Sequence, residues 1–149
     1  MDDPVSLLYF KQIAEDIKNM SADMNYSEYE TVREIINFVQ NIEYVYDGDD
    51  DFGEWPKYPI ETIFDKGGDC EDTSILLAGI LRELGYGLAF IQFDDHVALG
   101  ILGDDKMTGT YYNYEGNNYF YIETTNVGWG IGDIPEEYDG REAIIIPIN

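Results

Sequence analysis

The spacing of apolar residues changes from helical to strand-like about midway along the 149-residue chain. Before residue 85, apolar side chains recur every three or four positions, as on one face of a helix. After residue 87 they form short runs rich in Val, Ile, Phe and Tyr, which is typical of β-strands. Helices followed by antiparallel strands predict an α+β fold, and the length suits a single domain over residues 1–149.

Two N-terminal helices are expected from their starting signals. Asp3 can cap a helix that has Pro4 at its first position, and the helical spacing that follows ends near Met20. Ser27 and Glu30 have the spacing of a capping box, and an amphipathic segment comes directly after them. Both segments therefore predict helices with one buried face.

A third helix has the clearest limits of all, with Asp69 as its cap and Gly85 at its end. Its sequence is largely apolar, so we expect it to be buried against the sheet. Cys70 lies in its first turn, and the glycines 67–68 are expected to let the backbone turn tightly into it. Residues 47–59 combine an acidic run with Gly and Pro, which predicts a loop.

The second half of the chain predicts an antiparallel sheet. Asp94 and Asp95 can form a tight turn between the first two strands, and residues 115–118 have the composition of a second hairpin turn. The strand-like runs are residues 88–93, 96–102, 110–114, 119–124 and 142–148.

The charge limits the partners of this chain. Its 31 acidic and 8 basic residues give a formal net charge of −23, while 15% of the residues are aromatic. The aromatic content supports a folded core, and the scarcity of Lys and Arg argues against binding to nucleic acid or to an anionic membrane. Basic or amine-bearing partners and metal cations suit the charge better.

No segment of the sequence predicts export or membrane insertion. No apolar run approaches the roughly 18 residues of a membrane span, and the N-terminus lacks the basic start and apolar stretch of a signal peptide. A soluble protein is therefore expected. Its localisation stays open, including the case of a domain within a larger extracytoplasmic protein.

The chain has one cysteine and one histidine, and both lie where a nucleophile and its base would be useful. Cys70 begins a helix, whose positive end favours a thiolate, and His96 begins a strand. Glu123 is an acid in an otherwise apolar and aromatic strand, where a buried charge needs a partner. The alternatives are an inert buried thiol and a structural histidine, which are the more frequent cases for a lone Cys or His.

Five short motifs occur in a fixed order between residues 38 and 138: residues 58–63, 67–73, 81–86, 96–100 and 121–125. Together they resemble the transglutaminase-like superfamily of cysteine proteases. The most specific motif, residues 68–72 at a helix start, is also similar to bacterial and archaeal transglutaminase-like cysteine proteases. The resemblance implies a papain-like core, with the nucleophile on a central helix packed against an antiparallel sheet.

The resemblance also implies a reaction and the residues for it. Cys70 matches the family nucleophile, His96 the general base and Glu123 the acid that follows on the next strand, although that acid is commonly Asp. The implied enzyme is a thiol peptidase or amidase that cleaves peptide, isopeptide or other amide bonds of a protein substrate through a thioester. A protein-glutamine cross-linking transglutaminase, or a non-catalytic acidic binding domain of the same fold, are the alternatives.

Two further groups of residues are candidates for supporting roles. The Cys70 backbone N–H would donate to the oxyanion, and Trp55 or Tyr58 could supply the second donor, although both are equally suited to packing in their loop. Asp69 and Glu71 match acids that are associated with calcium in the bacterial relatives. Calcium would neutralise the acids around Cys70, but both side chains are also suited to a helix start alone. No cofactor is required by the implied reaction.

Overall fold

The computed structural model describes residues 2–46 and 56–149, in which helices come first and a sheet follows. The helices are α1 (Pro4–Asp23), α2 (Glu28–Gln40), α3 (Pro59–Asp65) and α4 (Cys70–Glu83). The strands are β1 (Glu43–Tyr44), β2 (Gly67–Gly68), β3 (Leu88–Gln92), β4 (Val97–Leu102), β5 (Tyr111–Tyr114), β6 (Asn117–Ile122) and β7 (Ile144–Ile148).

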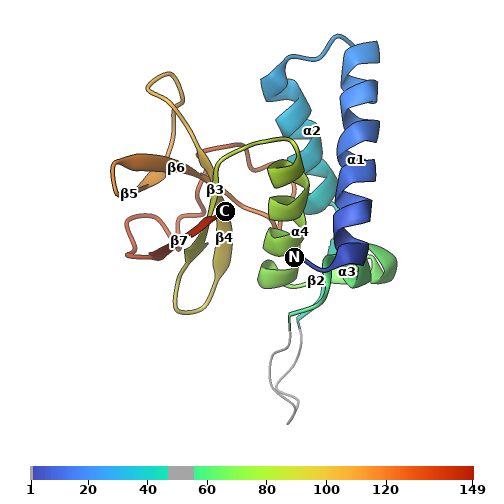
Figure 1. The fold of residues 1–149 in the computed structure, drawn as a ribbon. Coiled ribbons are helices and arrows are strands. Elements are labelled where there is room, and N and C mark those ends of the chain that lie inside the picture. The colour runs from blue at the N-terminus through green and yellow to red at the C-terminus, as the bar shows by residue number, and fades with distance from the viewer. Residues whose placement is uncertain (1, 47–55) are drawn as a thin grey trace.

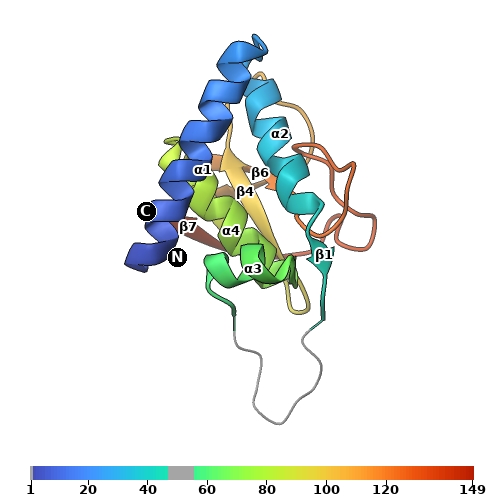
Figure 2. The ribbon, with the colours of Figure 1, turned by 90° about the vertical axis from the view of Figure 1, so that its right-hand side faces the viewer.

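The main sheet is antiparallel, with the strand order β5-β6-β4-β3-β7. Figures 1 and 2 show the helices on one side of this sheet, with α4 between the sheet and the α1–α2 pair. α4 packs against β4 on one side and against α1 and α2 on the other. The predicted α+β fold, with the Cys70 helix packed against an antiparallel sheet, is confirmed.

The hydrophobic core surrounds α4. Four side chains of α4 are fully buried and belong to the same cluster as Ile35 of α2: Leu76, Leu77, Ile80 and Leu81. A helix covered by protein on nearly every side is apolar nearly all round, as the sequence of α4 is. Burial of each such side chain stabilises the fold by about 1.5–3 kcal/mol. The helix that carries Cys70 at its start is therefore anchored in the hydrophobic core.

The helix starts lie where the sequence predicts them. The Asp3 side chain accepts a hydrogen bond from a first-turn N–H of α1 at 2.8 Å, and the capping box that begins at Ser27 starts α2. The end of α1 differs, because the helix continues from the expected Met20 to Asp23. Ser21 in this last turn is buried, so packing extends the helix beyond its apolar pattern.

Gly67 and Gly68, directly before the α4 cap, are needed for close packing and not for the tight turn that the sequence predicts. Neither Gly67 nor Gly68 has a positive φ, and the left-handed residue of this segment is Lys66, at φ 54°. The glycines form β2, which pairs in parallel with β1. A Cβ atom at Gly67 would lie 2.8 Å from Val45 Cγ2, and one at Gly68 would lie 2.7 Å from Asp72 Cβ. Close approach of backbone to neighbours requires glycine here.

The β5–β6 hairpin has a tighter turn than expected. Glu115 and Gly116 have φ angles of 49° and 85°, so two residues make the whole turn. Two positive φ angles give the turn a twist that matches the flanking strands. β6 therefore begins at Asn117, two residues before the predicted strand start at Tyr119.

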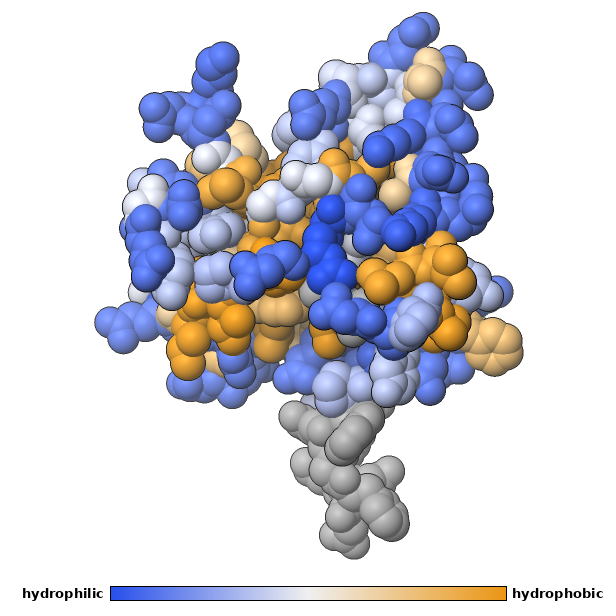
Figure 3. Space-filling view, viewed as in Figure 1, coloured by the Kyte–Doolittle hydropathy of each residue, from blue (hydrophilic) through white to orange (hydrophobic). Residues whose placement is uncertain are grey.

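Hydrophilic side chains cover much of the face in Figure 3, with apolar patches between them, in keeping with the charge of −23. Within the described ranges, none of the helices is both long enough and apolar enough to cross a membrane.

A first prediction concerns the contact between α1 and α4. A Cβ atom at Gly79 would lie 2.2 Å from Cζ of Phe10, whose ring is completely buried and has no room to move. We expect Gly79→Ala to lower the free energy of unfolding by about 1–3 kcal/mol, although alanine is the better helix former. Urea denaturation measures this change.

The control for this prediction is the double variant that also carries Phe10→Leu. A smaller side chain makes room for the methyl group, so the two changes should destabilise by less than their sum. Strict additivity would contradict the contact.

Candidate active site

Cys70 is the first residue of α4, directly after the cap residue Asp69. The Asp69 side chain accepts hydrogen bonds from the N–H groups of Glu71 and Asp72 at 2.9 and 3.0 Å. The Thr73 N–H donates to the Asp69 carbonyl at 3.1 Å. Among the described residues, the Cys70 N–H is therefore the first-turn donor without a backbone or carboxylate acceptor.

Asp72, on the first turn of α4, is almost completely buried. Its two oxygens accept hydrogen bonds from the backbone N–H groups of Lys57, at 2.8 Å, and Asp69, at 3.3 Å. Burial raises the Asp72 pKa, and the Lys57 N–H opposes part of that rise. This carboxylate fastens the segment around residue 57 to the start of the Cys70 helix.

His96 and Glu123 meet at the end of the central strands. His96 comes directly before β4 and Glu123 directly after β6, and these strands pair with Leu99 opposite Ile122. His96 Nε2 lies 3.1 Å from Glu123 Oε2, and the two residues are 8% and 1% exposed. Pairing of two neighbouring strands thus brings together the predicted base and acid.

Both Glu123 oxygens are held by several donors. Oε2 accepts from the Tyr121 hydroxyl at 2.8 Å as well as facing His96. Oε1 accepts from the N–H of Thr124 at 2.9 Å and from the N–H and hydroxyl of Thr125 at 3.1 and 2.8 Å. Burial alone would raise the Glu123 pKa, but His96 and Thr125 outweigh it and lower the pKa to about 2. Glu123 is therefore a carboxylate at neutral pH.

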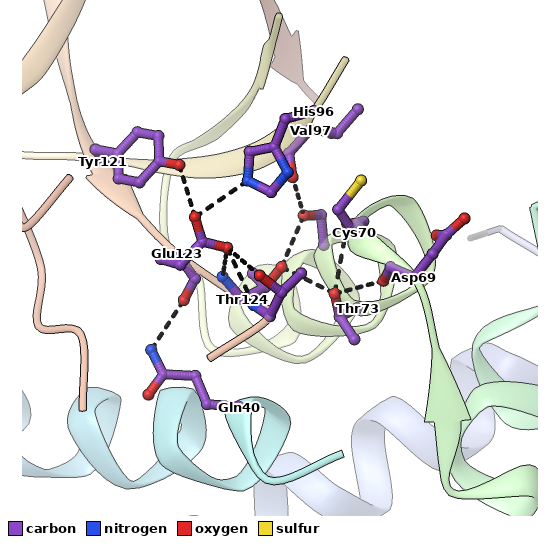
Figure 4. Close-up of polar contacts among 11 residues, drawn as sticks. Gln40, Asp69, Cys70, Thr73, His96, Val97, Tyr121, Glu123 and Thr124 are labelled. Atoms are coloured by element: carbon purple, nitrogen blue, oxygen red, sulfur yellow. Dashed lines mark hydrogen bonds and ion pairs between the residues drawn. The ribbon is translucent and has the colours of Figure 1, made fainter. Parts of the chain in front are cut away.

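The Cys70 sulfur lies on the side of the imidazole opposite Glu123 (Figure 4). Because Glu123 occupies Nε2, Nδ1 is the ring nitrogen left for the thiol. Burial lowers the His96 pKa, but Cys70 and Glu123 together outweigh it and raise the pKa to about 9. The three residues thus lie in the order thiol, imidazole, carboxylate, with an imidazole that holds a proton at neutral pH.

An aromatic cluster covers one face of the imidazole. The ring of Tyr138 stacks on His96 with 4.4 Å between centroids and 10° between planes, and Phe93 lies near both rings. Arg141 Cζ lies 5.4 Å from the ring centroids of Phe93 and Tyr138, and Arg141 Nη2 bonds to Asp95 at 2.9 Å. The sequence alone suggests no functional role for Phe93, Tyr138 or Arg141, because none of them carries a local signal.

A pocket of about 330 Å³ opens beside the His96–Glu123 pair. Both aromatic and polar side chains line it. The lining residues are Tyr44, His96, Glu123, Thr125, Asn126, Trp129, Pro135, Glu137 and Tyr138. A substrate chain could therefore reach the imidazole from this pocket.

Polar side chains of two helices fasten the end of β6. Gln40 of α2 donates through Nε2 to the Glu123 carbonyl at 2.9 Å (Figure 4) and also to the Trp129 carbonyl at 2.9 Å. The hydroxyls of Thr73 and Ser74 on α4 hydrogen bond to the Thr124 hydroxyl, at 2.9 and 3.2 Å. The sequence analysis missed this network, although a polar residue ending the apolar face of α2 was a signal for it.

Of the remaining predicted site residues, Asp69 joins this network, because its carbonyl accepts from the Thr73 hydroxyl at 2.8 Å (Figure 4). Trp55 falls outside the described residues. Tyr58 is the N-cap residue of α3, its side chain is 55% exposed, and its N–H donates to Glu61 at 2.9 Å. Asp69 and Glu71 flank Cys70, but the described part of the chain contains no group of three or more His, Cys, Asp or Glu arranged to hold a metal.

Comparisons with known proteins agree with the fold. The family model of the transglutaminase-like superfamily matches residues 11–91. LapG of Legionella pneumophila has a similar fold, with a TM-score of 0.51 and 16% identity, over 84% of this chain and 75% of LapG. Its calcium-bound structure gives a TM-score of 0.56 and 14% identity, over 96% of this chain and 83% of LapG. No curated protein matches the sequence.

A second prediction concerns the pH dependence of stability. Folding raises the His96 pKa from 6.5 to about 9, so its stabilising contribution is complete below pH 6.5 and is lost as pH rises through about 9. Folding lowers the Glu123 pKa from 4.5 to about 2, so that contribution is complete above pH 4.5 and is lost as pH falls through about 2. We expect the pair to stabilise the fold most between pH 4.5 and 6.5.

Urea unfolding of the wild type and of Glu123→Gln across the pH range measures this window. The stability difference between the two should shrink by about 2 kcal/mol from pH 6 to pH 10. A difference that stays constant with pH would contradict a charged pair.

Proposed function

The chain belongs to the transglutaminase-like superfamily, and we propose that it is a cysteine-dependent hydrolase of peptide, isopeptide or other amide bonds. The observation that carries this proposal is the order of Cys70, His96 and Glu123, with the carboxylate 3.1 Å from one ring nitrogen and the thiol on the opposite side. Such an order suits a thiol nucleophile whose base is oriented by a buried acid. We further propose that residues 1–149 act as a single domain.

In the proposed reaction, His96 holds the proton of Cys70 and the thiolate attacks the amide carbonyl carbon. The Cys70 N–H, left free by the Asp69 cap, then donates to the oxyanion. The tetrahedral intermediate expels the amine, which takes the proton from His96, and a thioester forms on Cys70. Water loses a proton to His96 as it attacks the thioester, and the carboxylic acid and free thiol are released.

Glu123 acts in this scheme through the imidazole. Its low pKa keeps it negative, so it holds His96 in one tautomer and stabilises the imidazolium formed when the thiol is deprotonated. The second oxyanion donor stays a prediction, with Trp55 and Tyr58 as the candidates.

The charge of the molecule supports a basic or amine-bearing protein substrate. The pocket beside His96 is lined by Glu137 as well as Glu123, and no Lys or Arg is among its described lining residues. The chain as a whole carries a net charge of −23, so acidic peptides would be repelled and Lys- or Arg-bearing ones attracted.

A third prediction tests the proposed nucleophile. Because Cys70 is the only cysteine, labelling by iodoacetamide reports on that thiol alone. At about pH 6 we expect Cys70 to react at least tenfold faster than glutathione, because a thiol next to an imidazolium is a stronger nucleophile than a free thiol. His96→Ala should remove this advantage, and Cys70→Ala should abolish both labelling and hydrolysis of Lys-containing peptides.

The control is Asn113→Ala, a change in the exposed β5–β6 hairpin. It should leave labelling at the wild-type rate. A wild-type thiol no more reactive than glutathione would reject the activated pair. Incorporation of a labelled primary amine into a Gln-containing protein, in preference to hydrolysis, would assign the transglutaminase alternative instead.

Calcium is a candidate ligand, because the sequence resemblance suggests it and a similar structure, that of LapG, is calcium-bound. Asp69 and Glu71 offer hard oxygen donors of the kind calcium takes, but two carboxylates supply fewer than the about six to eight ligands it needs. One Asp69 oxygen is already used by two N–H groups of α4. The described residues alone do not complete a calcium site.

A fourth prediction separates capping from metal binding. Asn caps a helix about as well as Asp but is a weaker calcium ligand, so Asp69→Asn should keep the stability of the calcium-free protein within about 0.5 kcal/mol. If calcium binds at residues 69 and 71, millimolar calcium should raise the Tm of the wild type and leave that of Asp69→Asn almost unchanged. Equal shifts in both proteins, or no shift beyond that produced by magnesium, would contradict a site there.

A further inference from the structure

We propose that Tyr138 is a positioning residue that fixes the plane of the His96 imidazole between Cys70 and Glu123. The proposal rests on the proposed function, because it assigns a role to Tyr138 through the base of that reaction. It starts from the closest ring contact in the site, with 4.4 Å between the centroids of Tyr138 and His96 and 10° between their planes.

The contacts other than this stack leave one rotation of the imidazole weakly restrained. The Phe93 N–H donates to the His96 carbonyl at 2.8 Å, which fixes the backbone and not the ring. Glu123 Oε2 holds Nε2 and Cys70 meets the ring from the other side, but both are contacts at the ring edge, and neither packs against a face of the ring. A tilt would move Nδ1 away from Cys70. A flat ring packed against one face opposes that motion.

Tyr138 is itself fixed from several directions. Its N–H donates to the Pro135 carbonyl at 2.9 Å, so it lies in a hydrogen-bonded turn. Arg141 Cζ lies 5.4 Å from the ring centroid of Tyr138 and 5.4 Å from that of Phe93. The Arg141 guanidinium bonds to Asp95 at 2.9 Å, one residue before His96. The turn that carries Tyr138 is thereby attached to the turn that carries His96.

The stack of Tyr138 on His96 has an electrostatic effect as well as a steric one. The face of a tyrosine ring is electron-rich, so it stabilises an imidazolium stacked on it more than a neutral imidazole. Arg141 is a second cation near the same ring, but its charge is matched by Asp95. The titratable or charged groups around His96 come from several elements of the described chain. They are Cys70 on α4, Tyr44 on β1, Tyr121 on β6, Glu123 after β6, Asp95 in the β3–β4 turn, and Glu137, Tyr138 and Arg141 near the C-terminus.

The test compares Tyr138→Leu, which removes the ring, with Tyr138→Phe, which keeps it. His96 is the only histidine, so an NMR pH titration follows its ring protons without ambiguity. Iodoacetamide is small, and its reaction with Cys70 at pH 6 does not depend on how a peptide fits the pocket. Tyr114→Leu, at the distant end of the β5–β6 hairpin, is the matched control.

We expect Tyr138→Leu to move the His96 titration to lower pH and to slow Cys70 labelling about three- to tenfold, while circular dichroism stays that of the wild type. Tyr138→Phe should restore both values to within about twofold of the wild type, because its ring stacks as well. Tyr114→Leu should change neither.

Two results would overturn the proposal: a His96 titration and labelling rate unchanged in Tyr138→Leu, or equal losses in the Leu and Phe variants. If Tyr138→Leu fails to fold, Arg141→Gln replaces it, and an unchanged His96 titration there would likewise count against positioning. Failure of the proposed function is a separate outcome, because the NMR titration detects the stack even if wild-type Cys70 reacts only as fast as glutathione.

Discussion

The buried pair of His96 and Glu123 is the interaction on which the arrangement of the site depends. A carboxylate that is 1% exposed would be expensive if it were unpaired, and each of its oxygens is therefore supplied with donors. The donors come from the neighbouring strand, from its own strand and from the residues that follow it. A shift of β4 relative to β6 by one residue would turn either His96 or Glu123 to the opposite face of the sheet, and the buried carboxylate would lose its imidazole partner. The pair therefore demands one register of the sheet.

Helices α2 and α4 both hydrogen bond to the segment at the end of β6 that carries Glu123. α2 reaches it through the hydrogen bonds of Gln40 to the carbonyls of Glu123 and Trp129, and α4 reaches it through the hydroxyls that surround Thr124. α4 also carries Cys70 at its first residue, so the hydroxyl contacts one turn along the helix fix the distance between thiol and strand end. Core packing alone fixes a helix axis well but its rotation less so. The polar contacts supply that remaining constraint.

The sequence was sufficient for features that are local and insufficient for those that depend on distant contacts. Helix starts at Asp3, Ser27 and Asp69 were predictable because a cap and the turn it satisfies are adjacent in the chain. Cys70, His96 and Glu123 were candidates because each stood out in its own segment. The stack of Tyr138 on His96 spans 42 positions and leaves no mark in either segment, so only the fold reveals it. The sequence correctly marked the glycines before α4 as important but suggested a tight turn as the cause. The actual cause, the close neighbours that exclude a side chain, could not be predicted because those neighbours come from other segments of the chain.

Asp72 and Glu123, the most deeply buried carboxylates among the described residues, show how the surroundings of a buried acid determine whether it favours its neutral or its charged form. Burial raises the pKa of both, yet the net shift is upward for Asp72 and downward for Glu123. Asp72 is met by backbone N–H groups of Lys57 and Asp69, with a second acid close by, and such partners satisfy its oxygens without requiring full charge. Glu123 is met by a ring that carries a proton at neutral pH, so each of the two groups stabilises the charged form of the other. Of these two acids, Glu123 is the one hydrogen-bonded to a titratable ring, so its fixed negative charge can stabilise a proton on that ring, and the proposed chemistry lies on the sheet side of α4.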